Sequence, residues 1–115
     1  MQQLQISATF PHVPPQAADE FNGLAAEALD NIRNEEGTLQ HDWFFSADGR
    51  RCHVRETYAS SEAFLDHLAG NGPILTRLVD LGGGLELEVF GEPSDAVLAA
   101  IAGFQPRLHT FSQGR

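Results

Sequence analysis

The chain contains no lysine, and all seven of its strongly basic side chains are arginines. Without a lysine amine, no side chain can form a Schiff base with a carbonyl compound, which excludes pyridoxal-phosphate enzymes and lysine-dependent aldolases. The 16 acidic residues give a formal net charge of −9, and no basic cluster offsets them. We therefore expect no nucleic-acid partner and no anionic membrane surface as a partner, because both bind positive charge.

Cysteine is almost absent as well. Cys52 is the single cysteine and cannot form an internal disulfide, which favours a reducing, cytoplasmic location. The apolar runs are too short to span a membrane, so no membrane association is expected. The sequence shows no basic stretch followed by an apolar one, so we expect no secretory leader.

Metal-binding and cofactor-binding motifs are also missing. The five histidines show no paired spacing of the kind that zinc sites use, and His41 and His53 fall on opposite faces of two predicted strands. The run Gly82-Gly83-Gly84 precedes a strand and lacks the G-x-G-x-x-G pattern of phosphate-binding loops. We therefore expect neither a metal ion nor a cofactor.

The hydrophobic pattern predicts one domain of mixed strands and helices, in keeping with a length of 115 residues. Gly37 is expected to cap the end of the first helix, and Ser60 the start of the next. In chain order we expect a strand over 3–10, a helix over 16–36, strands over 38–46 and 51–58, a helix from 60 to a break at 70–73, a second short helix over 74–81, a strand over 85–90, a helix over 95–102 and a short strand over 106–111.

The two central strands are expected to form a hairpin around Asp48-Gly49, a dipeptide typical of two-residue turns in which both residues have positive φ. A tight turn sets the register and gathers eight side chains on one face of the hairpin. The expected pairs are Phe45 with Cys52, Trp43 with Val54, His41 with Glu56, and Leu39 with Tyr58.

This order of elements predicts an α+β, ferredoxin-like βαββαβ domain over residues 1–92, with helices on one face of an antiparallel sheet. Residues 93–115 form a C-terminal helix–strand extension, either within the same domain or at a dimer contact. Phe44 and Phe90 are expected on the open face of the sheet. Exposed aromatic side chains on such a face favour a homodimer that pairs two sheets.

Three segments resemble the antibiotic-biosynthesis-monooxygenase-like family of dimeric α/β barrels. They match an E-G pair before the second strand and an E-x-[WY]-x-S-x-E-A-F-x-x-H run that leads from the third strand into a helix. The matching segments are Glu36-Gly37, Glu56-Thr57-Tyr58 and residues 60–68, SSEAFLDHL.

The resemblance implies a homodimer with a small apolar pocket between the sheet and the helices of each subunit. It also implies, among other activities in the family, oxidation of quinols or polyketide phenols by O₂ without flavin or metal. The haem-degrading branch is a poor match, because it has tryptophan at the position of His67 and its iron-binding histidine at the position of Arg77. A second histidine found in quinol-oxidising members is replaced here by Asn71-Gly72.

His67 is the first candidate catalytic residue. It follows Phe64 by three positions, so both side chains are expected to face the pocket from one side of the helix. A histidine titrates near neutral pH and is suited to take the proton of a phenol. The alternative is a buried structural histidine that is hydrogen-bonded to the backbone.

His41 and Glu56 form a second candidate group, as a cross-strand pair that would support proton transfer. Its alternative is a structural ion pair. The aromatic residues Trp43, Phe45 and Tyr58 are expected, with Phe64, to line the substrate pocket as flat walls. Their alternative is an ordinary hydrophobic core.

These observations favour a cofactor-independent monooxygenase that oxidises a small aromatic or quinol-like molecule with O₂. One alternative is a non-catalytic dimer that binds a small molecule as a sensor or carrier. The other is a structural dimer whose pocket is filled by its own side chains.

Overall fold

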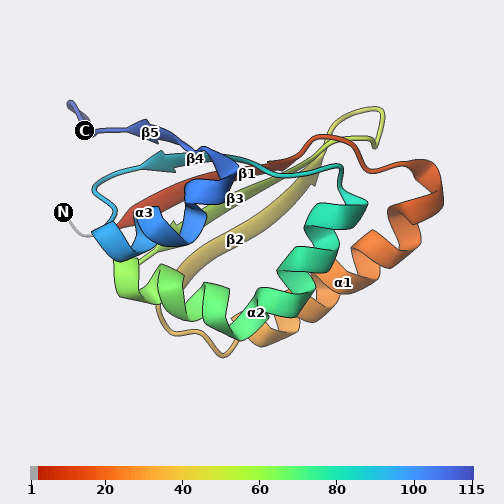
Figure 1. Cartoon of the computed structure of the whole chain (residues 1–115), viewed down its shortest axis with the longest axis horizontal. Helices are drawn as coiled ribbons and strands as arrows, with labels where there is room; N and C mark the ends of the chain where they lie inside the picture. Colours follow the sequence, from red (N-terminus) through yellow and green to blue (C-terminus); the bar gives the residue numbers. More distant parts are fainter. Residues whose placement is uncertain (1–2) are drawn as a thin grey trace.

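The computed structural model describes residues 3–115, which fold into one sheet covered by helices (Figure 1). The chain runs through β1 (Leu4–Phe10), η1 (Pro15–Ala17), α1 (Ala18–Ile32), β2 (Thr38–Phe45), β3 (Cys52–Tyr58), α2 (Ser61–Leu81), β4 (Glu86–Phe90), α3 (Asp95–Ile101), η2 (Ala102–Phe104) and β5 (Arg107–His109).

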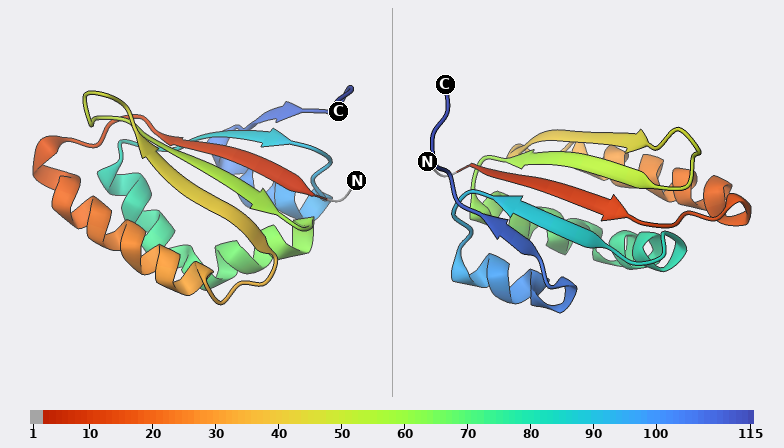
Figure 2. Two further views of the ribbon diagram at one scale, coloured as in Figure 1. Left: turned by 180° about the vertical axis from the view of Figure 1, so that it is seen from behind. Right: turned by 90° about the horizontal axis from the view of Figure 1, so that it is seen from above.

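The five strands lie in the order β2-β3-β1-β4-β5. The first four are antiparallel to their neighbours, whereas β5 pairs with β4 in parallel. Figure 2 shows that all three α-helices lie on the same side of the sheet. The expected α+β, ferredoxin-like βαββαβ fold is confirmed, with the predicted helix–strand extension at its end.

Period-two alternation creates the core on the helical side of the sheet. In β1 the side chains of Leu4, Ile6 and Ala8 are buried, whereas Gln5 is exposed on the other face. Helix α1 buries residues at helical spacing, and β3 and β4 contribute their own alternating sets. On the open face of the sheet, Phe44 and Phe90 are 54% and 39% exposed, in the positions expected for them.

Helix α1 ends four residues earlier than predicted, so Gly37 does not cap it. The helix stops at Ile32, and Arg33 is its C-terminal cap residue. Gly37 instead lies where the chain passes under α2, and a Cβ atom built there would be 2.4 Å from the Cβ of Ala63. The glycine is required by a close approach between two segments and not by a helix end.

Replacing Gly37 with alanine is expected to cost about 1–3 kcal/mol of unfolding free energy, because the new methyl group forces the β2 end of the chain away from α2. Urea denaturation of the variant measures this loss. Gly23→Ala is the matched control, since its Cβ meets nothing within 4 Å. Equal stability of Gly37→Ala and the parent chain would contradict the close contact.

Helix α2 is one continuous helix, so the predicted division into two helices at 70–73 is wrong. Pro73 lies inside it and cannot donate a hydrogen bond to the preceding turn, which bends the helix. The ribbon of α2 changes direction along its length in Figure 1. Continuity is supported from outside the helix, because Asn71 is fully buried and hydrogen-bonded to Glu35 and to Asn31 of α1.

The hairpin has the predicted register near its turn but not at its far end. Phe45 pairs with Cys52 and His41 with Glu56, as expected. The turn is not the two-residue type, because only Gly49 has positive φ and its N–H donates to the carbonyl oxygen of Ser46. A register shift between Thr38 and Gln40 then pairs Thr38 with Tyr58 and leaves Leu39 exposed, so the predicted Leu39–Tyr58 pair is wrong.

The C-terminal segment completes the same sheet and core. Val97 and Ile101 of α3 are buried in the main hydrophobic cluster. Strand β5 is anchored by His109, whose ring stacks on Phe90 at 4.7 Å and whose Nε2 lies 3.1 Å from a Glu88 oxygen. Across residues 3–115, no helix combines the length and the apolar character that crossing a membrane requires.

Candidate functional site

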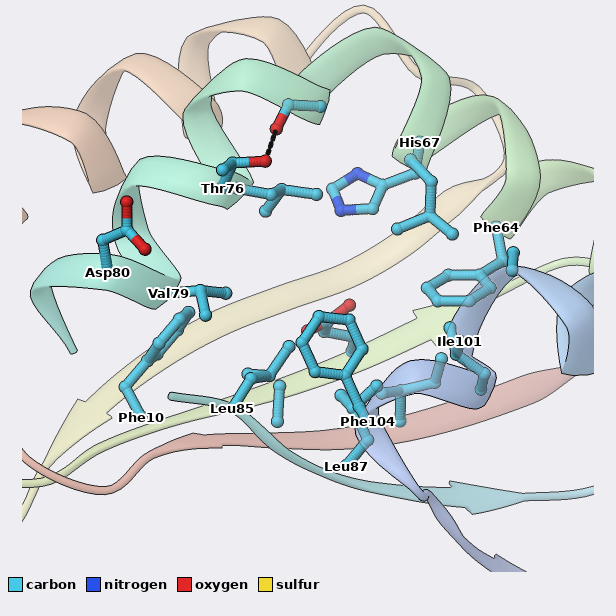
Figure 3. Close-up of a pocket in the computed structure, with 17 residues that line it drawn as sticks. Phe10, Phe64, His67, Thr76, Val79, Asp80, Leu85, Leu87, Ile101 and Phe104 are labelled. Atoms are coloured by element: carbon cyan, nitrogen blue, oxygen red, sulfur yellow. Dashed lines mark hydrogen bonds between the residues drawn. The ribbon is translucent and has the colours of Figure 1, made fainter. Parts of the chain in front are cut away.

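A cavity of about 400 Å³ lies between the sheet and the two helices α2 and α3 (Figure 3). Most of its lining is apolar, and the side chains of Phe10, Phe64, Leu87 and Ile101 project toward it. The four polar or charged residues along it are Glu56, His67, Thr76 and Asp80. Only Glu56 and His67 are buried, so they form the polar end of the cavity, whereas Thr76 and Asp80 are exposed.

His67 reaches this cavity from the first half of α2. Ser60 begins the helix as predicted, because its Oγ accepts a hydrogen bond from the Ala63 N–H at 3.1 Å. Two turns later, the His67 side chain is 2% exposed and its Nδ1 lies 3.0 Å from an oxygen of Glu35. A carboxylate only accepts hydrogen bonds, so Nδ1 carries the proton and Nε2 keeps its lone pair in the neutral ring.

Glu35 is a site residue that the sequence did not reveal. It lies between α1 and β2, and it accepts hydrogen bonds from Thr38 Oγ1 at 2.8 Å and from Asn71 Nδ2 at 2.9 Å, besides its bond to His67. Two successive glutamates after a helix interact unfavourably with the helix dipole. This unfavourable placement was the one feature of the sequence that pointed to a specific partner for Glu35, which is His67.

The charges of this pair follow from its surroundings. Burial raises the pKa of Glu35, but the hydrogen bonds from Thr38, Asn71 and His67 outweigh burial and hold it below its ordinary value. Burial lowers the pKa of His67, and the partly opposing effect of Glu35 does not restore it. At neutral pH the pair is therefore a carboxylate and a neutral imidazole, which is the form that accepts a proton.

Glu56 is the second buried polar group of the cavity and lies opposite His41 across the hairpin, as predicted. Its Oε1 accepts a 2.5 Å hydrogen bond from the Tyr58 hydroxyl and lies 3.6 Å from His41 Nε2. Burial, opposed by the Tyr58 hydrogen bond, raises the pKa of Glu56 to about 7. Burial also lowers the pKa of His41 to about 3, with a further contribution from His67.

His41, Glu56 and His67 bring three potential ligand atoms within 4.8 Å of one another, but the donor set does not suit a metal ion. The indole N–H of Trp43 donates to His41 Nδ1 at 3.0 Å. That nitrogen is therefore an acceptor, and the proton of the neutral ring lies on Nε2, the atom nearest Glu56. A metal ion needs the lone pair at Nε2, and binding it there would break the bond to Trp43.

The structure places the four residues that were predicted to form aromatic walls in different surroundings. Phe64 lines the cavity, whereas Trp43, Phe45 and Tyr58 do not. The reason is the sheet order, which places β2 at an edge under α1, so Trp43 and Phe45 pack near the ring of Phe21. Tyr58 is fully buried and donates a hydrogen bond to Glu56. The aromatic residues that line the cavity besides Phe64 are Phe10 and Phe104.

The raised pKa of Glu56 predicts how the stability of the fold changes with pH. Between pH 4.5 and 7 the folded chain keeps a proton on Glu56 that the unfolded chain has lost, so this residue destabilises the fold as pH rises through that range. His41 acts in the opposite direction below pH 6.5, because only the unfolded chain binds its proton there.

The unfolding free energy of Glu56→Gln is therefore expected to rise relative to that of the parent chain as pH increases from 4.5 to 7. The total rise is about 3 kcal/mol, at about 1.4 kcal/mol per pKa unit. Urea denaturation of both proteins at several pH values measures this difference. Glu27→Gln, an exposed change on α1, controls for the loss of one negative charge. A constant difference between Glu56→Gln and the parent chain across this pH range would show that Glu56 is ionised throughout.

Three solved structures show the same fold. MupZ from Pseudomonas fluorescens has a TM-score of 0.80 at 20% identity, over 99% of this chain and 93% of its own. Rv0793 from Mycobacterium tuberculosis has a TM-score of 0.70 at 22% identity, over 82% and 98%. SnoaB from Streptomyces nogalater, a cofactor-independent oxygenase, has a TM-score of 0.67 at 18% identity, over 82% and 96%. Coverage of 99% means that the MupZ match includes the α3–β5 segment.

Sequence comparison identifies the group to which the chain belongs. No curated protein matches it by sequence. The sequence profile described as antibiotic biosynthesis monooxygenase matches residues 6–72, more than half of the chain, and ends just after His67 and Asn71. The chain therefore belongs to the antibiotic biosynthesis monooxygenase family.

Proposed function

We propose that this protein is a cofactor-independent monooxygenase that oxidises a small phenolic or quinol-like molecule with O₂. The observation that carries the proposal is the Glu35–His67 pair at the buried end of an apolar cavity. The family assignment and the SnoaB-like fold support the same reaction class.

The pair would act on the substrate hydroxyl. His67 Nε2 takes the phenolic proton, and Glu35 stabilises the resulting imidazolium through its bond to Nδ1. The phenolate formed is rich in electrons and transfers them to O₂. One oxygen atom enters the ring, and the other leaves as water with two hydrogens from the substrate. The chain supplies orientation, a proton acceptor and a largely apolar cavity.

The cavity suits a flat substrate with one polar edge. Phe10, Phe64 and Phe104 provide aromatic surface around it, and aliphatic side chains from β4 and α2 fill the remaining lining. A phenol edge fits at Glu56 and His67, with the rest of the ring system among the apolar residues. In this proposal His67 is the catalytic base, and His41 and Glu56 support it.

A homodimer is part of the proposal, because Phe44 and Phe90 leave aromatic surface on the open face of the sheet. Pairing of two such faces would bury both rings in each subunit. We place the enzyme in the cytoplasm, where the single thiol of Cys52 stays reduced. Burial raises the pKa of that thiol to about 12, so Cys52 is an unreactive core residue.

Oxygen uptake with a panel of phenols, naphthols and hydroquinones tests the proposed reaction. We expect uptake that depends on substrate and a product that has gained one oxygen and lost two hydrogens, as measured by mass spectrometry. The purified protein is treated with a chelator beforehand to exclude adventitious metal. Saturable binding of these compounds without any product would instead establish a sensor or carrier.

A further inference from the structure

The cavity contains a second proton-carrying group, which supports phenol oxidation in the proposal above but takes no proton from the phenol. Glu56 is 8% exposed and lies on β3, facing His67 across the polar end of the cavity. Potential ligand atoms of the two side chains lie within 4.8 Å of each other. An acid and a base are thus placed on two sides of one small space.

We propose that this site also catalyses a reaction that consumes no oxygen, the enolisation of small cyclic ketones. His67 removes a proton from the carbon next to the carbonyl group, and Glu56 donates a proton to the carbonyl oxygen. A separation of this size accommodates both contacts, since each reacting atom lies about 3 Å from its catalytic partner.

The surroundings of Glu56 favour the acid form that this role needs. The groups that face it are the Tyr58 hydroxyl, the rings of His41 and His67, and more distantly the Glu35 carboxylate. Tyr58 and His41 are uncharged, His67 is neutral, and Glu35 is negative, so no cation among residues 3–115 stabilises an ionised Glu56. Aliphatic side chains of β1 and β4 surround the rest of the cavity end.

The hydrogen bonds of Glu56 leave one oxygen for the substrate. Tyr58 donates to Oε1, and no described side chain or backbone group hydrogen-bonds to Oε2. The proton of the acid is therefore free to lie on Oε2 and to meet a carbonyl oxygen in the cavity. His41 Nε2, the single fully buried side-chain polar atom without a partner among the described residues, lies beside the same carboxyl group as a further donor.

The step balances without an oxidant. The C–H bond breaks and its electron pair forms the new C=C bond, while the electrons of the C=O bond move to oxygen. The proton from carbon goes to His67 Nε2, and the oxygen takes the proton of Glu56. Reversal at the same carbon exchanges a substrate hydrogen with solvent, and return at a conjugated carbon moves a double bond.

Hydrogen–deuterium exchange under argon tests this activity with 2-indanone, 2-tetralone and 3-cyclohexenone as probes. In D₂O buffer at pH 7, proton NMR is expected to show loss of the α-hydrogens of at least one probe, 10-fold or more above the buffer rate. His67→Gln is expected to remove the excess exchange, and Glu56→Ala to reduce it at least 10-fold. Glu56→Gln, whose amide still donates to a carbonyl oxygen, retains more than Glu56→Ala.

His53→Gln is the matched control, because His53 lies on the other face of β3 and bonds to Thr9. Circular dichroism confirms that each variant is folded. Exchange at the buffer rate for all three ketones, or full exchange by folded His67→Gln, overturns the proposal. The monooxygenase proposal is tested separately by aerobic oxygen uptake, so either activity can be absent while the other is measured.

Discussion

Replacing His67 with glutamine is expected to lower substrate-dependent oxygen uptake by roughly 10²- to 10⁴-fold, the usual contribution of a positioned general base. Glutamine fills a similar space and can donate a hydrogen bond to Glu35, but it cannot accept a proton near neutral pH. The loss should appear in kcat more than in KM, because the imidazole acts when the phenolic proton moves.

The measurement compares His67→Gln with His53→Gln in an oxygen electrode, using the best substrate of the parent chain. His53 is half-buried on the opposite face of the sheet and does not line the cavity, so its change should leave uptake within about two-fold. A phenol with a lower pKa should recover part of the activity of His67→Gln, since more of it is already ionised. Turnover equal to that of the parent chain would remove His67 from the mechanism.

Replacing Phe21 with alanine is expected to cost about 3–5 kcal/mol of unfolding free energy. Phe21 is fully buried in α1, with ring centroids 5.1 Å from Phe10, 6.1 Å from Phe45 and 6.2 Å from Trp43. Each of these pairs has an edge-to-face geometry, which stabilises aromatic clusters beyond the area they bury. Alanine leaves a cavity among three rings that cannot all close around it.

A loss of this size is a large part of the 5–15 kcal/mol that stabilises a typical domain. Urea denaturation at one fixed protein concentration measures it, so that any association affects all variants equally. Phe111→Ala is the control, because Phe111 is 61% exposed and should cost no more than about 0.5 kcal/mol. A cost below about 1 kcal/mol for Phe21→Ala would show that α1 does not pack on β1 and β2 as described.

Local patterns were sufficient to predict most of the fold. Alternation predicted β1 and β4, helical spacing predicted α1, and the Asp48-Gly49 turn indicated the hairpin that pairs His41 with Glu56. These features depend on neighbours that are close in the sequence. The end of α1, the shift at Leu39 and the continuity of α2 depend on contacts with other elements, which local propensity does not contain.

The candidate site shows the same division. The orientation of His67 follows from its spacing to Phe64, and the sequence predicted it. Glu35 is 32 residues away in the chain, and only the packing of α1 on α2 brings it to the imidazole. The location of the cavity depends on α3 and η2, so Trp43 and Phe45 were assigned to a wall that the late part of the chain supplies instead.

The bend at Pro73 separates two tasks along one helix. Before the bend, α2 holds the imidazole against its carboxylate. After the bend, Leu75 and Val79 line the cavity, whose lining also includes residues near the end of the chain. Changes at Ala100, Ile101 or Phe104 can therefore widen or narrow the space for a guest molecule while the proton-transfer pair keeps its geometry. Proteins with this fold could therefore change their substrate range through substitutions in residues 100–104 alone. Directed evolution for a new substrate should begin with those residues.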